Sequence, residues 1–251
     1  MEEAEIVKIL VEEGEGLNRS IALRMNDTVK EYKNEDVFVL SILMGISIAG
    51  YANWDDNYIS NGLVYFKTGK KRPLKGLLKS TQRFGPETLK DAITMWREIY
   101  IAFKEKYNID FSVCSVKNIV EAQKDMLNTA GSLIDNKEAK GVGPWLFCFP
   151  FKTLAAYRMK LWGKPGFDDI LMPLGFEVIR GIRKITRKRL SFAQSYDTSL
   201  FQEEEGGLKE GMGTVYLSQG FSGKIAKIAG SNVIHINSGL FLLGSGDIEL
   251  T

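Results

Sequence analysis

The sequence predicts an all-α fold, and two observations support this prediction. Apolar residues recur at helical spacing in most segments, as in the stripe formed by Ile6, Leu10 and their neighbours. The hydrophobic fraction of 44% in a chain of 251 residues is enough for a sizeable core, which argues against global disorder. A chain of this length fits one large domain or two tightly joined halves.

Helical periodicity organises the first half of the chain. Pro86, followed by Glu87, stands at a first-turn position, where proline needs no hydrogen-bond donor. The segment Val37–Ala49 is apolar nearly all round, so it should be a buried helix. Further helices are expected at residues 6–11, at 21–29 and at 116–127.

The second half begins with a sharp break at residues 141–144, where two glycines precede a proline. We expect a long apolar helix from Trp145 to about Trp162, and another from Asp168 to Arg189 that bends near Pro173. Residues 203–213 should form a loop. Thr214–Ser218 and Val233–Ile236 could be short strands on their β-branched content, and Leu240–Leu243 should lie in a final helix.

Composition excludes several classes of protein. The start of the chain is acidic where a signal peptide is basic, no apolar run reaches about 18 residues, and two cysteines give no disulfide framework. We therefore expect a cytoplasmic protein with no membrane partner, and we also expect it to be a monomer. The single histidine, His235, excludes a two-histidine zinc site, and no Walker or dinucleotide-binding motif occurs, so we expect neither metal nor cofactor. Any catalysis would use carboxylates, amines or water.

A strongly basic segment stands near the middle of the second half. On a helix, Arg180, Arg183, Lys184 and Arg187 share one face, while Ile182 and Ile185 point toward the core. Such a face fits the backbone of a polyanion such as DNA. The alternative is a solvated helix face, but the few interleaved acids favour nucleic-acid binding.

The sequence Lys140-Gly141-Val142-Gly143-Pro144 opens the long apolar helix. Two glycines around a small aliphatic residue allow a tight turn between helices. The free N–H groups at the start of the next helix, with Lys140 beside them, suit a phosphate and would hold DNA without reading its sequence. An ordinary glycine-rich turn is the alternative.

The order of these two elements resembles the helix-hairpin-helix DNA glycosylase superfamily, and the closest likeness is to archaeal 8-oxoguanine DNA glycosylases. The likeness is carried by Gly141–Trp145, Leu146–Lys152, Pro173–Arg180 and His235–Gly244, and it is clearest between Lys140 and Gly244. It implies one all-α glycosylase-like domain over residues 1–251, with two helical subdomains flanking a cleft. These would be a helical bundle at residues 35–135, and residues 1–34 together with 136–251.

The resemblance also implies a base pocket made of Trp145, Phe149, Asn237 and Phe241, because an extruded base needs stacking surfaces. Core packing is the alternative for these aromatic residues. The chain departs from the family at several of these positions. The family's aspartate in the pocket falls at Asn237, and its tryptophan falls at Phe241.

The catalytic positions depart from the family as well. The family's nucleophilic lysine falls at Trp145, which cannot form a Schiff base, and its catalytic aspartate falls at Gly175 or at Glu177, depending on the register. We therefore expect Glu177 to activate a water molecule. A surface pair between Glu177 and Arg180 is the alternative. Asp168 and Asp169 are second choices for the acid, unless they only stabilise the start of a helix.

Three hypotheses follow for the function. The first is a DNA glycosylase-like protein that binds the DNA backbone and excises a flipped, modified base with water and a carboxylate. The second is the same fold with different chemistry on a modified base or nucleotide, as in hypermodified-thymine pyrophosphorylase-like members of the superfamily. The third is a DNA-binding module without catalytic activity, which would not need a base pocket.

Overall fold

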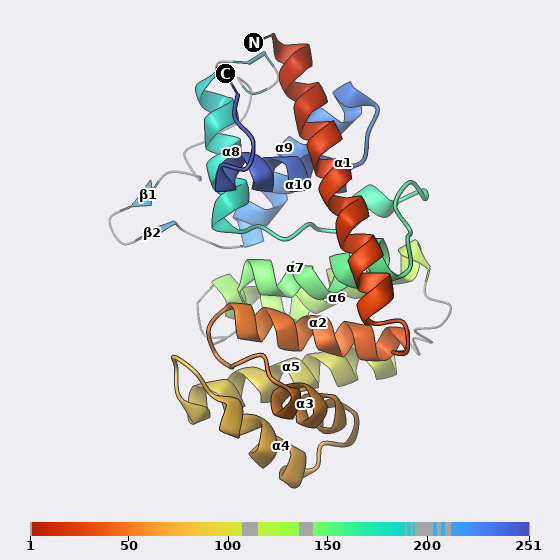
Figure 1. The fold of residues 1–251 in the computed structure, drawn as a ribbon, viewed down its shortest axis with the longest axis vertical. Coiled ribbons are helices and arrows are strands. Elements are labelled where there is room, and N and C mark those ends of the chain that lie inside the picture. The colour runs from red at the N-terminus through yellow and green to blue at the C-terminus, as the bar shows by residue number, and fades with distance from the viewer. Residues whose placement is uncertain are drawn as a thin grey trace.

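The structure, a computed structural model, describes residues 2–106, 115–135, 143–188, 190–191, 193, 203–204, 207–208 and 212–250. This part of the chain is predominantly helical, as the sequence predicts (Figure 1). Its strands are the short antiparallel pair β1 (Glu203–Glu204) and β2 (Gly207–Leu208). Lys140, Gly141 and Val142 of the predicted hairpin lie outside the described residues.

Helices of the first half form the lower part of the molecule in Figure 1. They are α2 (Asn34–Ile48), α3 (Asp56–Thr68), α4 (Lys71–Leu77) with the 3₁₀ turn η1 (Leu78–Ser80), α5 (Pro86–Lys106) and α6 (Val116–Asp135). The predicted buried helix is confirmed as α2, and the helix beginning at Pro86 is confirmed as α5. Inside this bundle Phe38 stacks on Phe103 at 5.1 Å between ring centroids, and Phe151 of α7 (Pro144–Lys152) meets Phe38 edge-on at 5.5 Å.

The upper part contains α1 (Glu3–Thr28), α8 (Phe176–Arg187), α9 (Met212–Ala229) and α10 (Val233–Ser245). The two apolar stripes predicted near the start of the chain belong to the single long helix α1. The helix α10 packs between α1 and α8, and its backbone touches both neighbours. A Cβ atom on Gly239 would lie 2.2 Å from the Leu10 carbonyl oxygen, and one on Gly181 would lie 2.0 Å from that of Leu240. Only glycine permits these crossings.

The helix α7 (Pro144–Lys152) continues directly into a π-helix, η2 (Thr153–Arg158). Pro150 inside α7 has no N–H to donate, and a proline within a helix disturbs its regular hydrogen bonding. In η2 the Met159 N–H donates to the Leu154 carbonyl five residues earlier, at 2.9 Å. The apolar helix predicted to reach Trp162 is therefore confirmed, but it ends at Arg158.

The prediction of a helix beginning at Asp168 is wrong over its first turns. A 3₁₀ turn, η3 (Phe167–Asp169), leads into an extended segment, and α8 begins only at Phe176. Pro173 disfavours helical conformation in the residue before it. Side-chain amides then take the place of helical hydrogen bonds. Gln123 of α6 exchanges bonds of 2.8 and 3.2 Å with the Leu171 backbone, and Gln219 of α9 accepts from the Met172 N–H at 3.0 Å.

The prediction of two possible strands near the end of the chain is also wrong. Thr214–Ser218 lies within α9, which packs against α10 and α1, and Val233–Ile236 lies within α10, which packs against α1 and α8. This burial outweighs the weak strand preference of their β-branched residues. Leu240–Leu243 is confirmed as helical. Residues 203–213, expected as a loop, contain β1 and β2, and α9 begins at Met212.

Candidate functional site

A cavity of about 450 Å³ lies where α1, α7, η2, α8 and α10 meet. Five residues singled out from the sequence line it together: Trp145 and Phe149 from α7, Glu177 from α8, and Asn237 and Phe241 from α10. They come from three helices separated by long stretches of sequence, so tertiary packing brings them to one place. Met44 of α2 lines the same cavity.

Trp145 and Phe149 form an aromatic wall of the cavity. They are four residues apart on α7, and their rings stack with centroids 4.9 Å apart and planes 19° from parallel. Both rings are only half-buried, and Phe241 is 40% exposed. These aromatic side chains therefore leave a flat apolar surface open to a ligand, in contrast to the fully buried rings of the core.

Asn237 joins the cavity to the extended segment that precedes α8. Its side chain is 3% exposed, and its Nδ2 donates to the Pro173 carbonyl oxygen at 3.3 Å. Pro173 and Gly175 also line the cavity. The amide of Asn237 thus holds in place the chain that leads into the first turn of α8.

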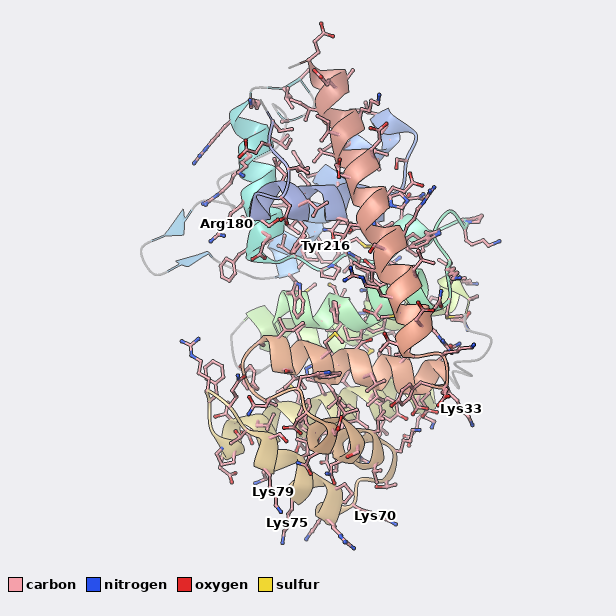
Figure 2. All side chains as sticks on the ribbon, viewed as in Figure 1. Lys33, Lys70, Lys75, Lys79, Arg180 and Tyr216 are labelled. Atoms are coloured by element: carbon pink, nitrogen blue, oxygen red, sulfur yellow. The ribbon has the colours of Figure 1, made fainter. Side chains whose placement is uncertain are left out.

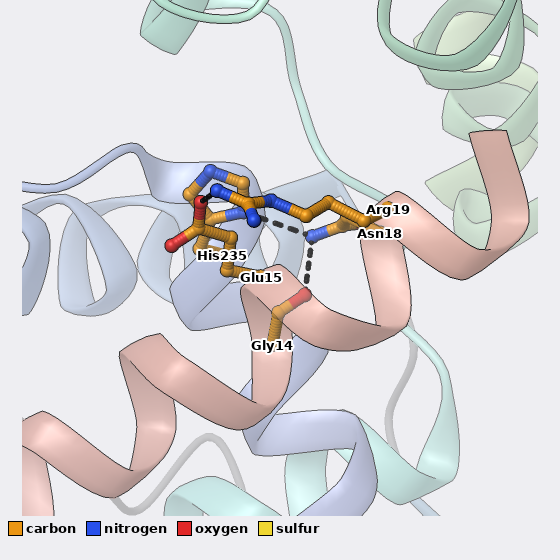
Figure 3. A network of polar contacts seen from close by, with 5 residues as sticks. All are labelled: Gly14, Glu15, Asn18, Arg19 and His235. Carbon is orange, nitrogen blue, oxygen red and sulfur yellow. Dashed lines mark hydrogen bonds and ion pairs between the residues drawn. The ribbon is translucent and has the colours of Figure 1, made fainter. Parts of the chain in front are cut away.

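A buried polar network centred on Asn18 ties together three elements that carry the cavity. Its Oδ1 accepts from the Tyr157 hydroxyl of η2 at 2.8 Å and from the Ser238 hydroxyl of α10 at 3.0 Å. Its Nδ2 donates to the Gly14 carbonyl oxygen at 2.8 Å, within α1 (Figure 3). Because buried polar groups without partners are costly, this network fixes α1, η2 and α10 relative to one another.

His235, the only histidine, belongs to this network and does not line the cavity. Its Nδ1 lies 3.2 Å from Asn18 Nδ2, beside the ion pair of Glu15 and Arg19 (Figure 3). Burial lowers the pKa of His235 below its usual value. A neutral ring that accepts the Asn18 amide at Nδ1 fits both observations, so the role of His235 is structural.

Among the three candidate acids, the structure brings Glu177 to the cavity and keeps Asp168 and Asp169 away from it. Glu177 is half-buried in the first turn of α8 and is the one carboxylate among the described residues that line the cavity. Asp168 instead accepts the Val233 N–H at 3.0 Å and caps the start of α10. Asp169 is exposed in η3.

Glu177 lies beside the aromatic wall. A Cβ atom on Gly175 would lie 3.3 Å from Trp145 Cδ1 and 3.4 Å from Glu177 Oε2, so the indole and the carboxylate flank the same glycine. The expected alternative, an ion pair of Glu177 with Arg180, does not form among the salt bridges of the described residues. The carboxylate is therefore available to a ligand.

The sequence analysis did not single out several polar residues of the cavity, among them Lys152 and Thr153. Lys152 is 9% exposed, and its Nζ lies 5.7 Å above the Tyr157 ring without a hydrogen bond or ion pair to a described residue. Burial lowers the pKa of Lys152 to about 8. The Thr153 hydroxyl is buried and has no hydrogen-bond partner among the described residues. A lone lysine after an apolar run gives no sequence signal of its burial.

The basic face of α8 is partly free and partly used in packing. Ile182 and Ile185 are buried, as predicted, and Arg180 and Arg187 are exposed. Lys184 donates from Nζ to the Leu243 carbonyl oxygen at 2.7 Å, so it also closes the end of α10. Arg183 is half-buried. Figure 2 shows Arg180 on the upper half of the molecule, on the same helix as Glu177.

Gly143 is the part of the predicted hairpin that the structure describes. It is exposed and precedes α7 as its N-cap, without a side-chain hydrogen bond to the helix. In the described part of the chain, no helix is long and apolar enough to cross a membrane, and no cluster of three or more potential metal-ligating side chains occurs. Comparisons with protein-family models, curated proteins and solved structures gave no significant match to this chain.

Proposed function

We propose that the protein is a DNA glycosylase-like enzyme that binds the DNA backbone and takes an extruded base into the cavity. One observation carries this proposal: the stacked pair Trp145–Phe149, Asn237, Phe241 and Glu177 line a single cavity. A base that leaves the duplex needs an aromatic surface and polar groups at its edge. The exposed Arg180 and Arg187 on the helix that carries Glu177 would contact the neighbouring phosphates.

The chemistry that fits this site is hydrolysis of the bond between base and sugar. Glu177 would act as a general base toward water and would stabilise the positive charge that develops on the sugar. The water oxygen forms the new bond to the sugar carbon while one water proton passes to Glu177. The base leaves with the electrons of the broken bond and takes up that proton. The aromatic wall would hold the base while this occurs.

We also propose the two-subdomain arrangement of the helix-hairpin-helix glycosylases. The cleft would lie between residues 35–135 and the unit formed by residues 1–34 and 136–251. In support, Met44 of α2 lines the cavity from the first unit, and the remaining lining residues belong to the second. The helix α2 packs against both α7 and η2.

Base release from a panel of duplexes, each with one modified base, tests the proposed function. We expect release from at least one duplex, and Glu177→Gln should lower the rate by about 10²–10⁴ while DNA affinity stays the same. Asp169→Asn is the matched control, because Asp169 is an exposed acid outside the cavity. No release by the wild type, or full activity in Glu177→Gln, would contradict the proposal.

A water-based mechanism also makes a prediction about covalent trapping. Since Trp145 stands where the family has its nucleophilic lysine, borohydride reduction during turnover should leave no cross-link between protein and DNA. Lys152 is the amine that the structure places in the cavity. A cross-link that disappears in Lys152→Met would replace the water mechanism by one that uses this amine.

A further inference from the structure

Two neighbouring polar side chains of the cavity have no hydrogen-bond or ion-pair partner among the residues that the structure describes. Lys152 is 9% exposed and Thr153 is 2% exposed, and both line the cavity. The Lys152 ammonium makes no hydrogen bond or ion pair with a described residue, and the Thr153 hydroxyl makes no hydrogen bond with one. Buried polar groups are normally paired, so orphaned ones beside an open cavity call for a partner from a ligand.

The charges around the cavity determine which kind of partner fits. Arg24 of α1 adds a second, exposed cation to the lining, and Glu177 is the one carboxylate among the described lining residues. No salt bridge among the described residues includes Lys152, and burial lowers the pKa of its ammonium. An oxyanion would both neutralise the ammonium and accept the Thr153 hydroxyl.

We propose that the cavity selects a planar base that carries an anionic oxygen substituent, such as a carboxylate, which pairs with Lys152 and accepts a hydrogen bond from Thr153. The Trp145–Phe149 wall supplies the stacking surface for the ring, and the volume of about 450 Å³ accommodates a single substituted base. This inference rests on the proposed function for the statement that the ligand is a base, and it adds the chemical class of that base.

Binding of free nucleosides, measured by calorimetric or NMR titration, tests this selectivity without DNA. The probes are 5-carboxy-2′-deoxyuridine and thymidine, which differ in the charge of the substituent at one ring position. At pH 7 we expect the carboxylated nucleoside to bind about tenfold more tightly or better, as charge-assisted hydrogen bonds imply. Lys152→Met should remove this preference, and Thr153→Val should reduce it. Lys164→Met, at an exposed lysine outside the cavity, should retain it.

The preference should also fall as the pH rises through the pKa of Lys152, because only the ammonium form pairs with the carboxylate. The other charged or titratable groups around it are Arg24 of α1, Tyr157 of η2 and Glu177 of α8, which line the same cavity, and His235 of α10, which feels the charge of Lys152 from outside the cavity. Burial raises the pKa of Tyr157 and lowers that of His235, which moves both titrations away from the region of pH 8. Lys152→Met should show no such pH dependence.

Equal affinity of the wild type for the two nucleosides, or no binding of either, would overturn the proposal. A preference that survives in Lys152→Met would overturn it as well. Failure of the glycosylase proposal would look different, because a protein that releases no base from DNA would still distinguish the two nucleosides. Far-ultraviolet circular dichroism of each variant checks that it is folded.

Discussion

Lys152 is 9% exposed, and its ammonium group has no counter-ion among the described residues. Burial lowers its pKa from 10.5 to about 8, so below pH 8 the folded state carries the full cost of the buried charge. Lys152→Met should therefore increase the free energy of unfolding at pH 7 by about 2–3 kcal/mol. Urea denaturation of both proteins measures this difference.

The stabilisation by Lys152→Met should depend on pH because of the same pKa. Between pH 8 and 10.5 the folded wild type loses the proton while the unfolded chain keeps it, so wild-type stability rises and the advantage of Lys152→Met shrinks. Lys164→Met, at an exposed position, should change stability by less than about 0.5 kcal/mol. If Lys152→Met is less stable than the wild type at pH 7, the buried ammonium does not destabilise the folded state.

Single residues show where sequence reasoning succeeds and where it stops. Trp145 and Phe149 could be assigned to one surface because their spacing of four residues on a helix requires it. Asp168 could not be assigned, since its role as the cap of α10 depends on a contact with Val233, 65 residues away. Lys152 was missed because its burial results from packing of α1 and η2, which local sequence does not encode.

At the scale of elements, the crossing of α1 and α10 depends on glycine. A Cβ atom on Gly14 would lie 1.9 Å from the His235 carbonyl oxygen, and one on Gly239 would lie 2.2 Å from that of Leu10. Gly14→Ala or Gly239→Ala should therefore force the helices apart and lower the free energy of unfolding by more than about 2 kcal/mol. Thermal or urea denaturation provides the measurement.

Gly16, on the same helix, supplies the control for this prediction. It is exposed, and no atom lies within 4 Å of a Cβ atom built on it. Gly16→Ala should stabilise the protein by about 0.5–1 kcal/mol, because alanine is the better helix former. Destabilisation of similar size at Gly14 and Gly16 would mean that helix propensity, and not the close crossing, governs both positions.

The helices α2 and α5 could be predicted from their apolar residues, which cover nearly all of α2 and form a stripe along α5. The segment before α8 could not. Its extended backbone is satisfied by Gln123, Gln219 and Asn237 from three distant helices, and such tertiary hydrogen bonds override local preference. The strand predictions for the last part of the chain were wrong for a related reason, because burial stabilises α9 and α10 as helices despite their β-branched residues.

At the scale of the whole molecule, the positions of the basic groups predict how the proposed binding of DNA depends on salt. Arg180 and Arg187 are exposed on α8, whereas Lys70, Lys75 and Lys79 lie at the opposite end of the molecule (Figure 2). DNA affinity should fall steeply with salt, and Arg180→Ala with Arg187→Ala should reduce the slope of log K against log salt by about 2. Fluorescence anisotropy with several DNA sequences should show that the double variant loses the same amount of affinity for each sequence.

The double variant avoids Arg183 and Lys184, because Lys184 also holds the end of α10 through Leu243. Lys75→Ala with Lys79→Ala removes the same charge from the far end and should leave the slope nearly unchanged. If both double variants reduce the slope equally, net charge alone and not the α8 face governs the binding.

The π-helix η2 lets the cavity tolerate the loss of one residue from the chain. A π turn holds one residue more than an α turn, so deletion of a single residue between Thr153 and Arg158 would allow an ordinary α turn in its place. Because the wider turn absorbs the extra residue, the helix before it and the chain after it would keep their directions. Arg158 would then still bind the carbonyl oxygens of the α1–α2 connection. A one-residue deletion within α7 would instead rotate the side chains on its two sides by about 100° relative to each other and would separate Trp145 from Phe149. A relative of this protein with a one-residue gap in η2 would thus keep the cavity, even though its chain is shorter.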